Sequence, residues 1–447
     1  MAQLPLLPLR HPHDREILRL AIPAFGALVA EPLFLLADSA IVGHLGTPQL
    51  AGLGVAGTVL QTAIYLCVFL AYGTTARVAR QLGAGNRRAA LEGGVDGVWL
   101  AVAIGLGILA VGIPAAPLVV GMFSPSEAVA SHAVVYLRIS LAGMPPMLMV
   151  LAATGVLRGL QDTRTPLVVA AVGSAANVVL NIGLVYGAGL GLAGSALGTV
   201  LAQTGMAAAY LVVVIRGARR HGARLRPHGP GILASGAAGI PLFVRTLTLR
   251  VVLIVATAVA TRLGDAPLAA HQVAFTIWTF LALALDAVAI AAQAIVGRYL
   301  GASDVVGARA ATRRMMEWGV AAGAALGVLV AVARPAYVPL FTPDPEVRAL
   351  LAAALLVMAV LQPLAGVVFV LDGVLIGAGD GPYLAAAGVA AMLAFLPAAW
   401  VVLATGIGLT GLWWAIGLWV VARLVTLGLR ARGSAWLVTG PVRAERR

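Results

Sequence analysis

Twelve long apolar segments constrain the fold of this chain more than any other feature. A membrane-spanning helix needs about 20 predominantly apolar residues to cross a hydrocarbon core of roughly 30 Å. The segments run approximately over residues 17–43, 48–76, 95–120, 132–157, 166–187, 192–215, 233–261, 267–296, 316–340, 349–376, 383–405 and 409–429. Because a bilayer offers no water to backbone polar groups, we expect an all-α integral membrane protein with twelve transmembrane helices.

The composition excludes a soluble globular protein and a disordered one. Of the 447 residues, 61% are hydrophobic and 11% are charged, whereas soluble domains have about 45–50% apolar and roughly 25% charged residues. The single cysteine, Cys67, lies in an apolar segment. An intrachain disulfide and a cysteine-rich metal site are therefore both excluded.

The positive charge is carried by arginine alone, and its distribution predicts an orientation. The 30 basic residues are all arginines, and they fall in short clusters between the apolar segments. This pattern argues against a nucleic-acid partner and for basic loops on one side of a membrane. If both termini are cytoplasmic, 23 arginines lie on that side and three on the other. Alanine, glycine and arginine richness suggests a bacterial genome, and so a multi-pass protein of the cell membrane.

The two halves of the sequence are an internal repeat with a nearly constant offset of 218 residues. Arg80 with Leu82-Gly83-Ala84 aligns with Arg298 and Leu300-Gly301-Ala302, and Gly155-Val156-Leu157 aligns with Gly373-Val374-Leu375. Six helices per half make the repeats parallel, related by a pseudo-two-fold axis along the membrane normal. Such repeats are typical of transporters that work by alternating access. A duplicated scaffold without transport is the alternative.

This repeat predicts the domain organisation. We expect a cytoplasmic N-terminal tail at 1–16, an N-terminal six-helix lobe at 17–215, a cytoplasmic linker at 216–232, a C-terminal six-helix lobe at 233–430 and a cytoplasmic C-terminal tail at 431–447.

Two carboxylates in the first apolar segment are the main candidates for an ion-coupling site. Glu31 and Asp38 are seven residues apart, which places them on one face of a helix. Charged groups inside a bilayer are costly and are functional hypotheses by default. Pro23 and Pro32 flank this stretch and permit a helix bend that would act as a gate. The alternative is that both carboxylates are merely hydrated.

The fifth segment and the second half hold the other polar intrusions. Asn177 and Asn181 lie four residues apart; they either complete a polar pocket with Asp38 or bond neighbouring helices. Candidate substrate-cavity residues in the second half are Arg245, Gln272, Asp286 and Asp372, with Arg250 nearby. Arg–Asp pairing within the fold is the alternative there. Gly319, Gly323 and Gly327 predict close helix packing.

Known catalytic motifs are missing from the sequence. It contains no Walker-A loop, no HExxH, no GxSxG and no dinucleotide-binding glycine fingerprint. We therefore predict no enzyme activity, no cofactor and no resident metal. Transport would be driven by an ion gradient of protons or sodium.

Several motifs resemble one transporter family. Glu31-Pro32, the stretch from Ala37 to Gly46, and Leu50-Ala51-Gly52-Leu53-Gly54 are similar to the opening of the multidrug and toxic compound extrusion (MATE) family, in its DinF-like branch. Arg158-Gly159-Leu160-Gln161-Asp162-Thr163 and Ala269-Ala270-His271-Gln272 resemble the same branch. The resemblance covers about residues 15 to 430. It implies two six-helix bundles around a V-shaped cavity and efflux of organic cations or amphipathic compounds.

The resemblance also implies roles for individual residues. The family's first-helix aspartate falls on Asp38, the proline whose bending accompanies its protonation on Pro23, and the fifth-helix polar pair on Asn177 and Asn181. The second member of that pair is an aspartate in some DinF-like proteins, so this chain has one carboxylate fewer. The resemblance leaves proton and sodium coupling both open.

Two readings of the substrate remain. The first is an antiporter for small molecules, working as a monomer in the lipid bilayer. The second, within the same superfamily, is a flippase for a lipid-linked precursor, in which Arg245 and Arg250 would bind a pyrophosphate.

Overall fold

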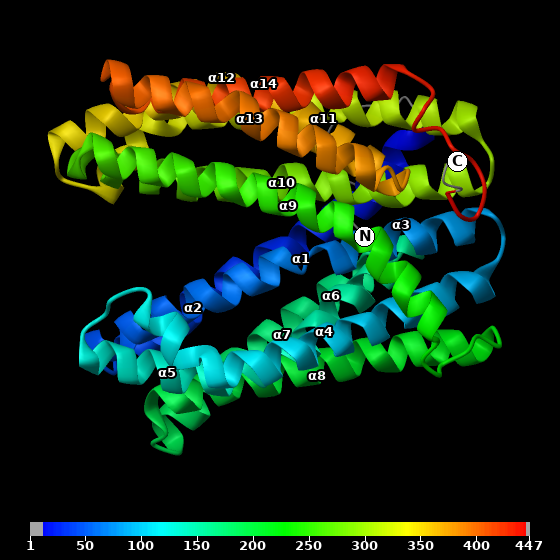
Figure 1. Cartoon of the computed structure of the whole chain (residues 1–447), viewed down its shortest axis with the longest axis horizontal. Coiled ribbons are helices and arrows are strands. Elements are labelled where there is room, and N and C mark those ends of the chain that lie inside the picture. Colours follow the sequence, from blue (N-terminus) through cyan, green and yellow to red (C-terminus); the bar gives the residue numbers. More distant parts are fainter. Residues whose placement is uncertain (1–11, 444–447) are drawn as a thin grey trace. The chain divides into compact units, whose positions relative to one another are not determined.

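The computed structural model describes residues 12–443, and within this range the regular elements are all helices, without strands (Figure 1). The predicted tails at 1–16 and 431–447 lie partly outside the described residues. The helices are α1 (Pro12–Gly43), α2 (Thr47–Leu66), α3 (Phe69–Gly83), α4 (Arg87–Gly121), α5 (Glu127–Leu141), α6 (Met144–Gly159), α7 (Arg164–Ile182), the π-helical turn η1 (Gly183–Gly187), α8 (Gly191–Arg220), α9 (Gly229–Leu263), α10 (Asp265–Gly301), α11 (Val305–Phe341), α12 (Pro345–Gly377), α13 (Gly381–Thr405) and α14 (Gly408–Arg432).

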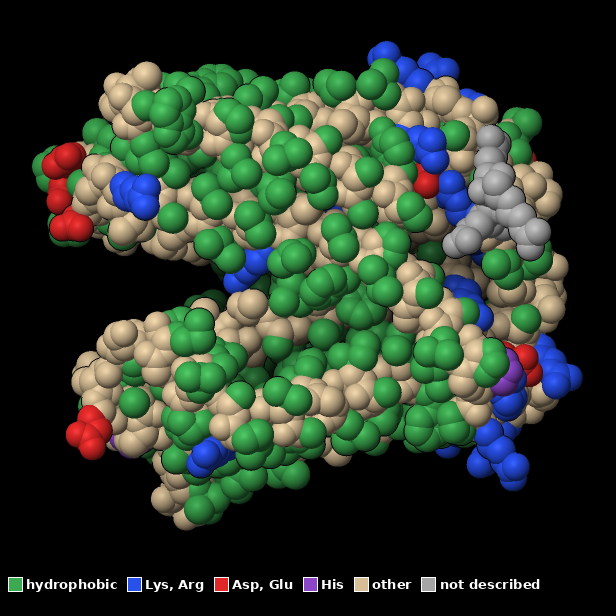
Figure 2. Space-filling model, in the orientation of Figure 1, with side chains coloured by type: hydrophobic (Ala, Val, Ile, Leu, Met, Phe, Trp, Pro, Cys, Tyr) green, Lys and Arg blue, Asp and Glu red, His purple; other side chains and the backbone are tan. Residues whose placement is uncertain are grey.

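These helices account for every apolar segment. Eleven stretches among the described residues are long and apolar enough to span a membrane, and α5 with α6 forms a twelfth that is bent by 51°. Large apolar side chains such as Leu340 and Leu118 are 83% and 74% exposed, and Figure 2 shows hydrophobic side chains over much of the visible face. Such surfaces are stable in lipid and not in water. The chain is a multi-pass membrane protein.

Several helices extend past their apolar segments into polar residues. For example, α11 begins at Val305, although its apolar segment begins near residue 316. Its N-cap, Asp304, accepts a hydrogen bond from the Gly307 amide (2.7 Å), and Asn86 caps α4 in the same way by accepting from Ala89 (2.9 Å). Residues 86 and 304 are 218 apart, so the repeat extends to the helix caps.

The two halves differ where helices break. The second and fourth spans of the first half are interrupted at Cys67–Val68 and at Ala142–Gly143, whereas their counterparts α10 and α12 are continuous. The tandem prolines Pro145 and Pro146 follow the second break. Two missing backbone donors make an uninterrupted helix unfavourable there.

The chain divides into two compact units, each of which combines parts of both repeats. One contains the residues up to Phe25 together with those from Val244 onward, and the other contains Gly26–Phe243. The divisions fall inside α1 and inside α9, at positions 218 residues apart. Pro23 and Pro241 precede them by two residues. The repeat is therefore also visible in the way the units are built.

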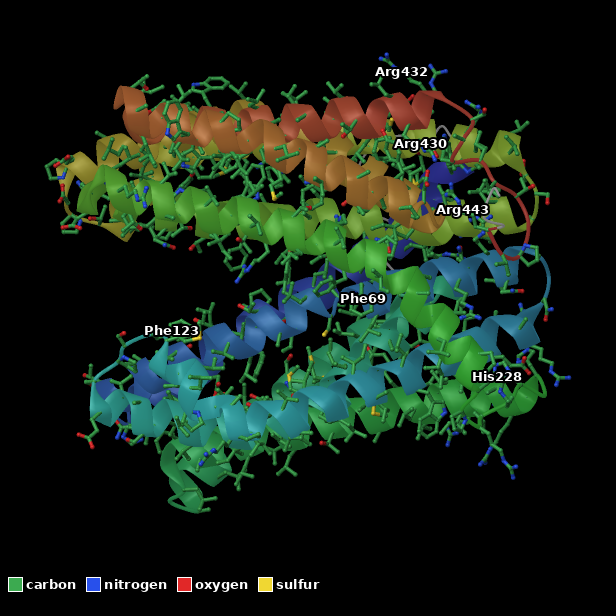
Figure 3. All side chains as sticks on the ribbon, in the orientation of Figure 1. Phe69, Phe123, His228, Arg430, Arg432 and Arg443 are labelled. Atoms are coloured by element: carbon green, nitrogen blue, oxygen red, sulfur yellow. The ribbon has the colours of Figure 1, made fainter. Side chains whose placement is uncertain are left out.

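Close helix contacts hold each unit together. In the unit containing α11 and α12, a Cβ added to Gly323 would overlap the carbonyl of Gln362, and one added to Gly319 would press on Gly366. In the other unit, Gly155 of α6 lies equally close to Ala71 of α3. The predicted small-residue packing of α11 is thus confirmed. Phe123 and His228 lie at opposite ends of the unit formed by Gly26–Phe243 (Figure 3).

Candidate functional site

Asp38 lies deep in the unit formed by Gly26–Phe243. Asp38 is 3% exposed, although most of its neighbours on α1 are exposed. The C-terminal end of α1 is fixed nearby, because the Tyr186 hydroxyl of η1 donates to the Ile41 carbonyl (2.6 Å). A buried carboxylate needs hydrogen-bond partners, and three other helices supply them.

Three donors converge on the Asp38 carboxylate. Oδ1 accepts from the Ser195 hydroxyl of α8 (2.5 Å) and from Nδ2 of Asn181 on α7 (2.8 Å). Oδ2 accepts from the Tyr136 hydroxyl of α5 (3.2 Å). Both carboxylate oxygens are therefore held by neutral donors from α5, α7 and α8. The arrangement fixes the orientation of the carboxylate.

The two predicted asparagines continue this network. Nδ2 of Asn181 also lies 3.2 Å from Oδ1 of Asn177, whose own Nδ2 donates to the Thr199 hydroxyl (3.2 Å). A Cβ added to Gly198 would overlap Oδ1 of Asn181. Glycine at position 198 thus leaves the space that Asn181 occupies. The pair therefore bonds both to Asp38 and to the neighbouring helix α8.

The structure does not bring Glu31 into this network. Glu31 is exposed, whereas Asp38 is buried. The carboxylate of Glu31 is hydrogen-bonded to Gln61 of α2. Pro23 lies on α1 two residues before the boundary between the compact units. Of the residues predicted for coupling, Asp38, Asn177 and Asn181 form one cluster, which we call the Asp38 cluster together with Tyr136, Ser195 and Thr199.

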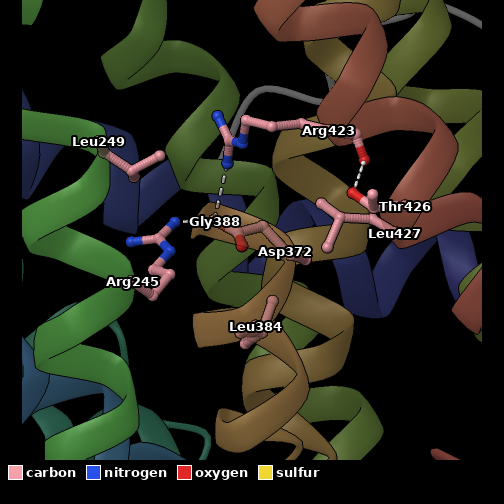
Figure 4. Close-up of a pocket in the computed structure, with 9 residues that line it drawn as sticks. Arg245, Leu249, Asp372, Leu384, Gly388, Arg423, Thr426 and Leu427 are labelled. Atoms are coloured by element: carbon pink, nitrogen blue, oxygen red, sulfur yellow. Dashed lines mark hydrogen bonds and ion pairs between the residues drawn. The ribbon is translucent and has the colours of Figure 1, made fainter. Parts of the chain in front are cut away.

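In the other unit, Asp372 of α12 is paired with two arginines. Arg245 of α9 forms an ion pair with its carboxylate, and Nη2 of Arg423 on α14 lies 3.2 Å from Oδ2 (Figure 4). The guanidinium of Arg423 also lies over the Trp419 ring, 5.1 Å from its centroid. Arg245, Asp372 and Arg423 line a cavity of about 10 Å³, which is close to the minimum that holds one water.

The remaining second-half candidates lie apart from this cavity. Gln272 is exposed and Asp286 is half-buried, and neither lines the cavity beside Asp372. The structure therefore joins Arg245 with Asp372, and leaves the other two elsewhere on α10.

Sequence reasoning missed Tyr136, Ser195, Thr199 and Arg423. The first three are neutral residues in apolar segments and attract no attention singly. One signal was present, because Ser195 and Thr199 are four residues apart and so share a face of α8. Tyr136 and Arg423 carry no comparable local pattern, since their partners are 98 and 51 residues away.

A family model matches most of the chain. The MatE model aligns with residues 23–183 and 241–410. The two matched regions begin 218 residues apart, as the internal repeat requires.

Curated relatives match over nearly the whole length. "Protein DETOXIFICATION 44, chloroplastic" from Arabidopsis thaliana is 30% identical over 96% of this chain and 85% of its own length. "DNA damage-inducible protein F" from Escherichia coli is also 30% identical, over 92% of this chain and 94% of its own.

Solved structures share the fold. A MOP superfamily transporter from Pyrococcus furiosus superimposes with a TM-score of 0.85 at 22% identity, covering 95% of this chain and 96% of that one. The Vibrio cholerae MATE transporter VcmN in its bent form gives 0.86 at 21% identity, covering 94% and 96%. The predicted all-helical fold class is confirmed.

Proposed function

Because the chain belongs to the MatE family of multidrug and toxic compound extrusion transporters, we propose that it exports organic cations or other amphipathic compounds in exchange for protons, with Asp38 as the coupling residue. A member of this family is an efflux transporter and not an enzyme. The coupling ion, the class of compound and the part played by Asp38 are our inferences.

The observation that carries the proposal is the isolation of one carboxylate among neutral donors. Asp38 is 3% exposed and accepts hydrogen bonds from Asn181, Ser195 and Tyr136. When a proton binds, one carboxylate oxygen becomes a donor and the group loses its negative charge, which weakens the hydrogen bonds that it accepts. Protonation thereby changes how α1 is held against α5, α7 and α8.

The donors around Asp38 support a proton over sodium. Hard metal cations bind several oxygen ligands, among which carboxylates are prominent. Here the amide of Asn181 and the hydroxyls of Ser195 and Tyr136 direct hydrogens at the carboxylate. A proton needs one carboxylate oxygen only.

Coupling follows if proton and substrate compete for the same charge state. An ionised Asp38 attracts an organic cation, and a protonated Asp38 does not. Two ligands that exclude each other at one site are thermodynamically linked, so the downhill flux of one drives the other. We propose that Pro23, close to the boundary between the units, allows α1 to bend as Asp38 changes state.

The geometry beside Asp372 argues against the flippase. Arg245 is ion-paired with Asp372, and the adjoining cavity of about 10 Å³ has no room for a pyrophosphate. A small-molecule antiporter is therefore the reading we favour. We also propose that the protein works as a monomer in the bacterial cell membrane. The arginine distribution supports an orientation with both termini cytoplasmic.

The test is ethidium efflux from proteoliposomes under an imposed pH gradient and, separately, a sodium gradient. We expect efflux with the pH gradient alone, and its loss in Asp38→Asn. Asp265→Asn is the matched control, because Asp265 is an exposed aspartate at the start of α10, outside the Asp38 cluster. Sodium-driven efflux of the wild type, or proton-driven efflux by Asp38→Asn at the wild-type rate, would contradict the proposal.

A further inference from the structure

A second cavity lies at one end of the unit that contains α10 to α14. It has a volume of about 410 Å³ and is lined by Pro12, Arg15, Glu16 and Arg19 of α1 and by Arg298 of α10. Ligand pockets commonly measure about 300–1,000 Å³. The four α1 residues are spaced at i, i+3, i+4 and i+7, so they occupy one face of the helix.

The lining of this cavity is strongly basic. It has three arginines and one glutamate, a formal charge of +2. Glu16 is paired with Arg298 (2.6 Å), and the Arg298 guanidinium lies 5.0 Å from the centroid of the Tyr299 ring. The neighbouring carboxylate of Asp14 is directed away, because it accepts from Arg314 and Trp318 and is 1% exposed. The pocket therefore presents positively charged donors, one of which is held in place.

The fold itself does not require these charges. In the second repeat, the positions equivalent to Arg15, Glu16 and Arg19 hold Leu233, Ala234 and Ala237. Those apolar residues lie near the beginning of α9, which is the counterpart of α1 in the second repeat and has a similar length. The counterpart of Arg298 is Arg80, which is 3% exposed, whereas the Arg298 side chain is 33% exposed. The basic pocket is thus a feature of one repeat and not of the duplicated scaffold.

Its position suits the headgroup layer of a bilayer. The pocket joins the beginning of α1 to the end of α10, and the arginine distribution predicts that this end is cytoplasmic. Arginine forks bind phosphate oxygens in a bidentate manner, and basic pockets between membrane helices on the cytoplasmic side bind anionic headgroups. We propose that the pocket lined by Arg15, Arg19 and Arg298 binds the phosphate group of an anionic phospholipid.

The test measures binding to the purified full-length protein in detergent. The probes are short-chain phosphatidylglycerol, short-chain phosphatidylcholine and inorganic phosphate, each followed by native mass spectrometry and by thermal shift. We expect phosphatidylglycerol to bind, and the double variant Arg15→Gln/Arg19→Gln to bind it about tenfold more weakly, as the loss of charged hydrogen bonds implies. The matched control is Arg309→Gln/Arg313→Gln, which removes the same charge from exposed positions of α11 outside the pocket.

Three outcomes would overturn the proposal. These are equal binding of phosphatidylglycerol by the Gln variant and the wild type, equal binding of phosphatidylcholine by the wild type, and inorganic phosphate binding as tightly as the lipid. The last would assign the pocket to free phosphate. If the Gln variant does not fold, Arg15→Lys/Arg19→Lys replaces it, with weaker but measurable binding expected and unchanged binding contradicting the role of the guanidinium forks. None of these readouts depends on transport.

Discussion

At the residue scale, the chain uses its buried charges in two different ways. Asp38 accepts hydrogen bonds from three neutral donors, and in our proposal its charge changes when a proton binds. Asp372 is held by Arg245 and Arg423, so its charge is balanced within the protein. Burial alone does not distinguish the two aspartates, since they are 3% and 5% exposed. The identity of their partners does.

Removing one donor from Asp38 should change the pH dependence of transport. The Ser195 hydroxyl bonds the carboxylate at 2.5 Å, and donors to a carboxylate favour its ionised form. In Ser195→Ala the ionised form loses this support, so a proton binds at higher pH. We expect the midpoint of ethidium efflux against pH to move upward by about one unit.

The control for this variant is Thr204→Val. Thr204 is also on α8, but its hydroxyl bonds the backbone carbonyl of Val200 and is outside the Asp38 cluster. An unchanged midpoint in Ser195→Ala, or an equal change in Thr204→Val, would show that Ser195 does not act through Asp38.

Asp372 should matter for stability more than either arginine that it binds. Asp372→Asn deprives Arg245 and Arg423 of the carboxylate they share, whereas Arg245→Met leaves Asp372 paired with Arg423. Breaking a buried ion pair costs about 3–5 kcal/mol. Unfolding in detergent, followed by tryptophan fluorescence, should therefore give a lower free energy for Asp372→Asn than for Arg245→Met. The reverse order would mean that Asp372 is a functional and not a structural group.

The Asp38 cluster was only partly predictable from sequence. A charge inside an apolar segment is conspicuous, and so are two asparagines four residues apart, which is why Asp38, Asn177 and Asn181 could be found. Tyr136 and Ser195 could not, because a tyrosine or a serine costs little in a membrane helix. Their role depends on contacts between segments 98 and 157 residues apart.

At the element scale, hydrophobicity predicts the helices and glycine predicts some of their contacts. The twelve apolar segments lie within the observed spans. Their lengths were less predictable, because helix ends are polar and depend on caps such as Asp304 and Asn86. The break at Cys67–Val68 could not be predicted, because the sequence has no proline or glycine there.

Two glycines should respond oppositely to alanine. A Cβ at Gly323 would overlap the Gln362 carbonyl, whereas nothing lies within 4 Å of a Cβ at Gly428 on α14. Overpacking costs about 1–3 kcal/mol, and alanine in an open helical site is favourable by up to about 1 kcal/mol. We expect Gly323→Ala to lower the unfolding temperature in detergent and Gly428→Ala to keep or raise it. Equal effects would contradict the close contact of α11 with α12.

At the scale of the whole molecule, the duplication explains most of the architecture. The offset of 218 residues relates the helix caps, the two regions matched by the MatE model and the two positions at which the compact units divide. The sequence placed the lobe boundary in the linker, whereas the units divide inside α1 and α9. Repeats reveal which segments are equivalent, but not with which half each segment packs.

The arginine distribution makes a prediction about topology. Alkaline phosphatase fused after Arg447 should be inactive and green fluorescent protein fused there should fluoresce, because this end is predicted to be cytoplasmic. Alkaline phosphatase fused after Gly264, between α9 and α10, should be active. The opposite pattern would invert the orientation and place the basic pocket on the outer side.

The central claim is that a proton and a substrate compete for the Asp38 carboxylate. The most direct test is to add ethidium to the purified protein in weakly buffered detergent solution and to measure the protons released, beside Asp38→Asn and the control Asp265→Asn. We expect about one proton per bound ethidium from the wild type and the control, and none from Asp38→Asn, as linkage at a single site requires. Ethidium binding without proton release in the wild type, or equal release from Asp38→Asn, would contradict the account.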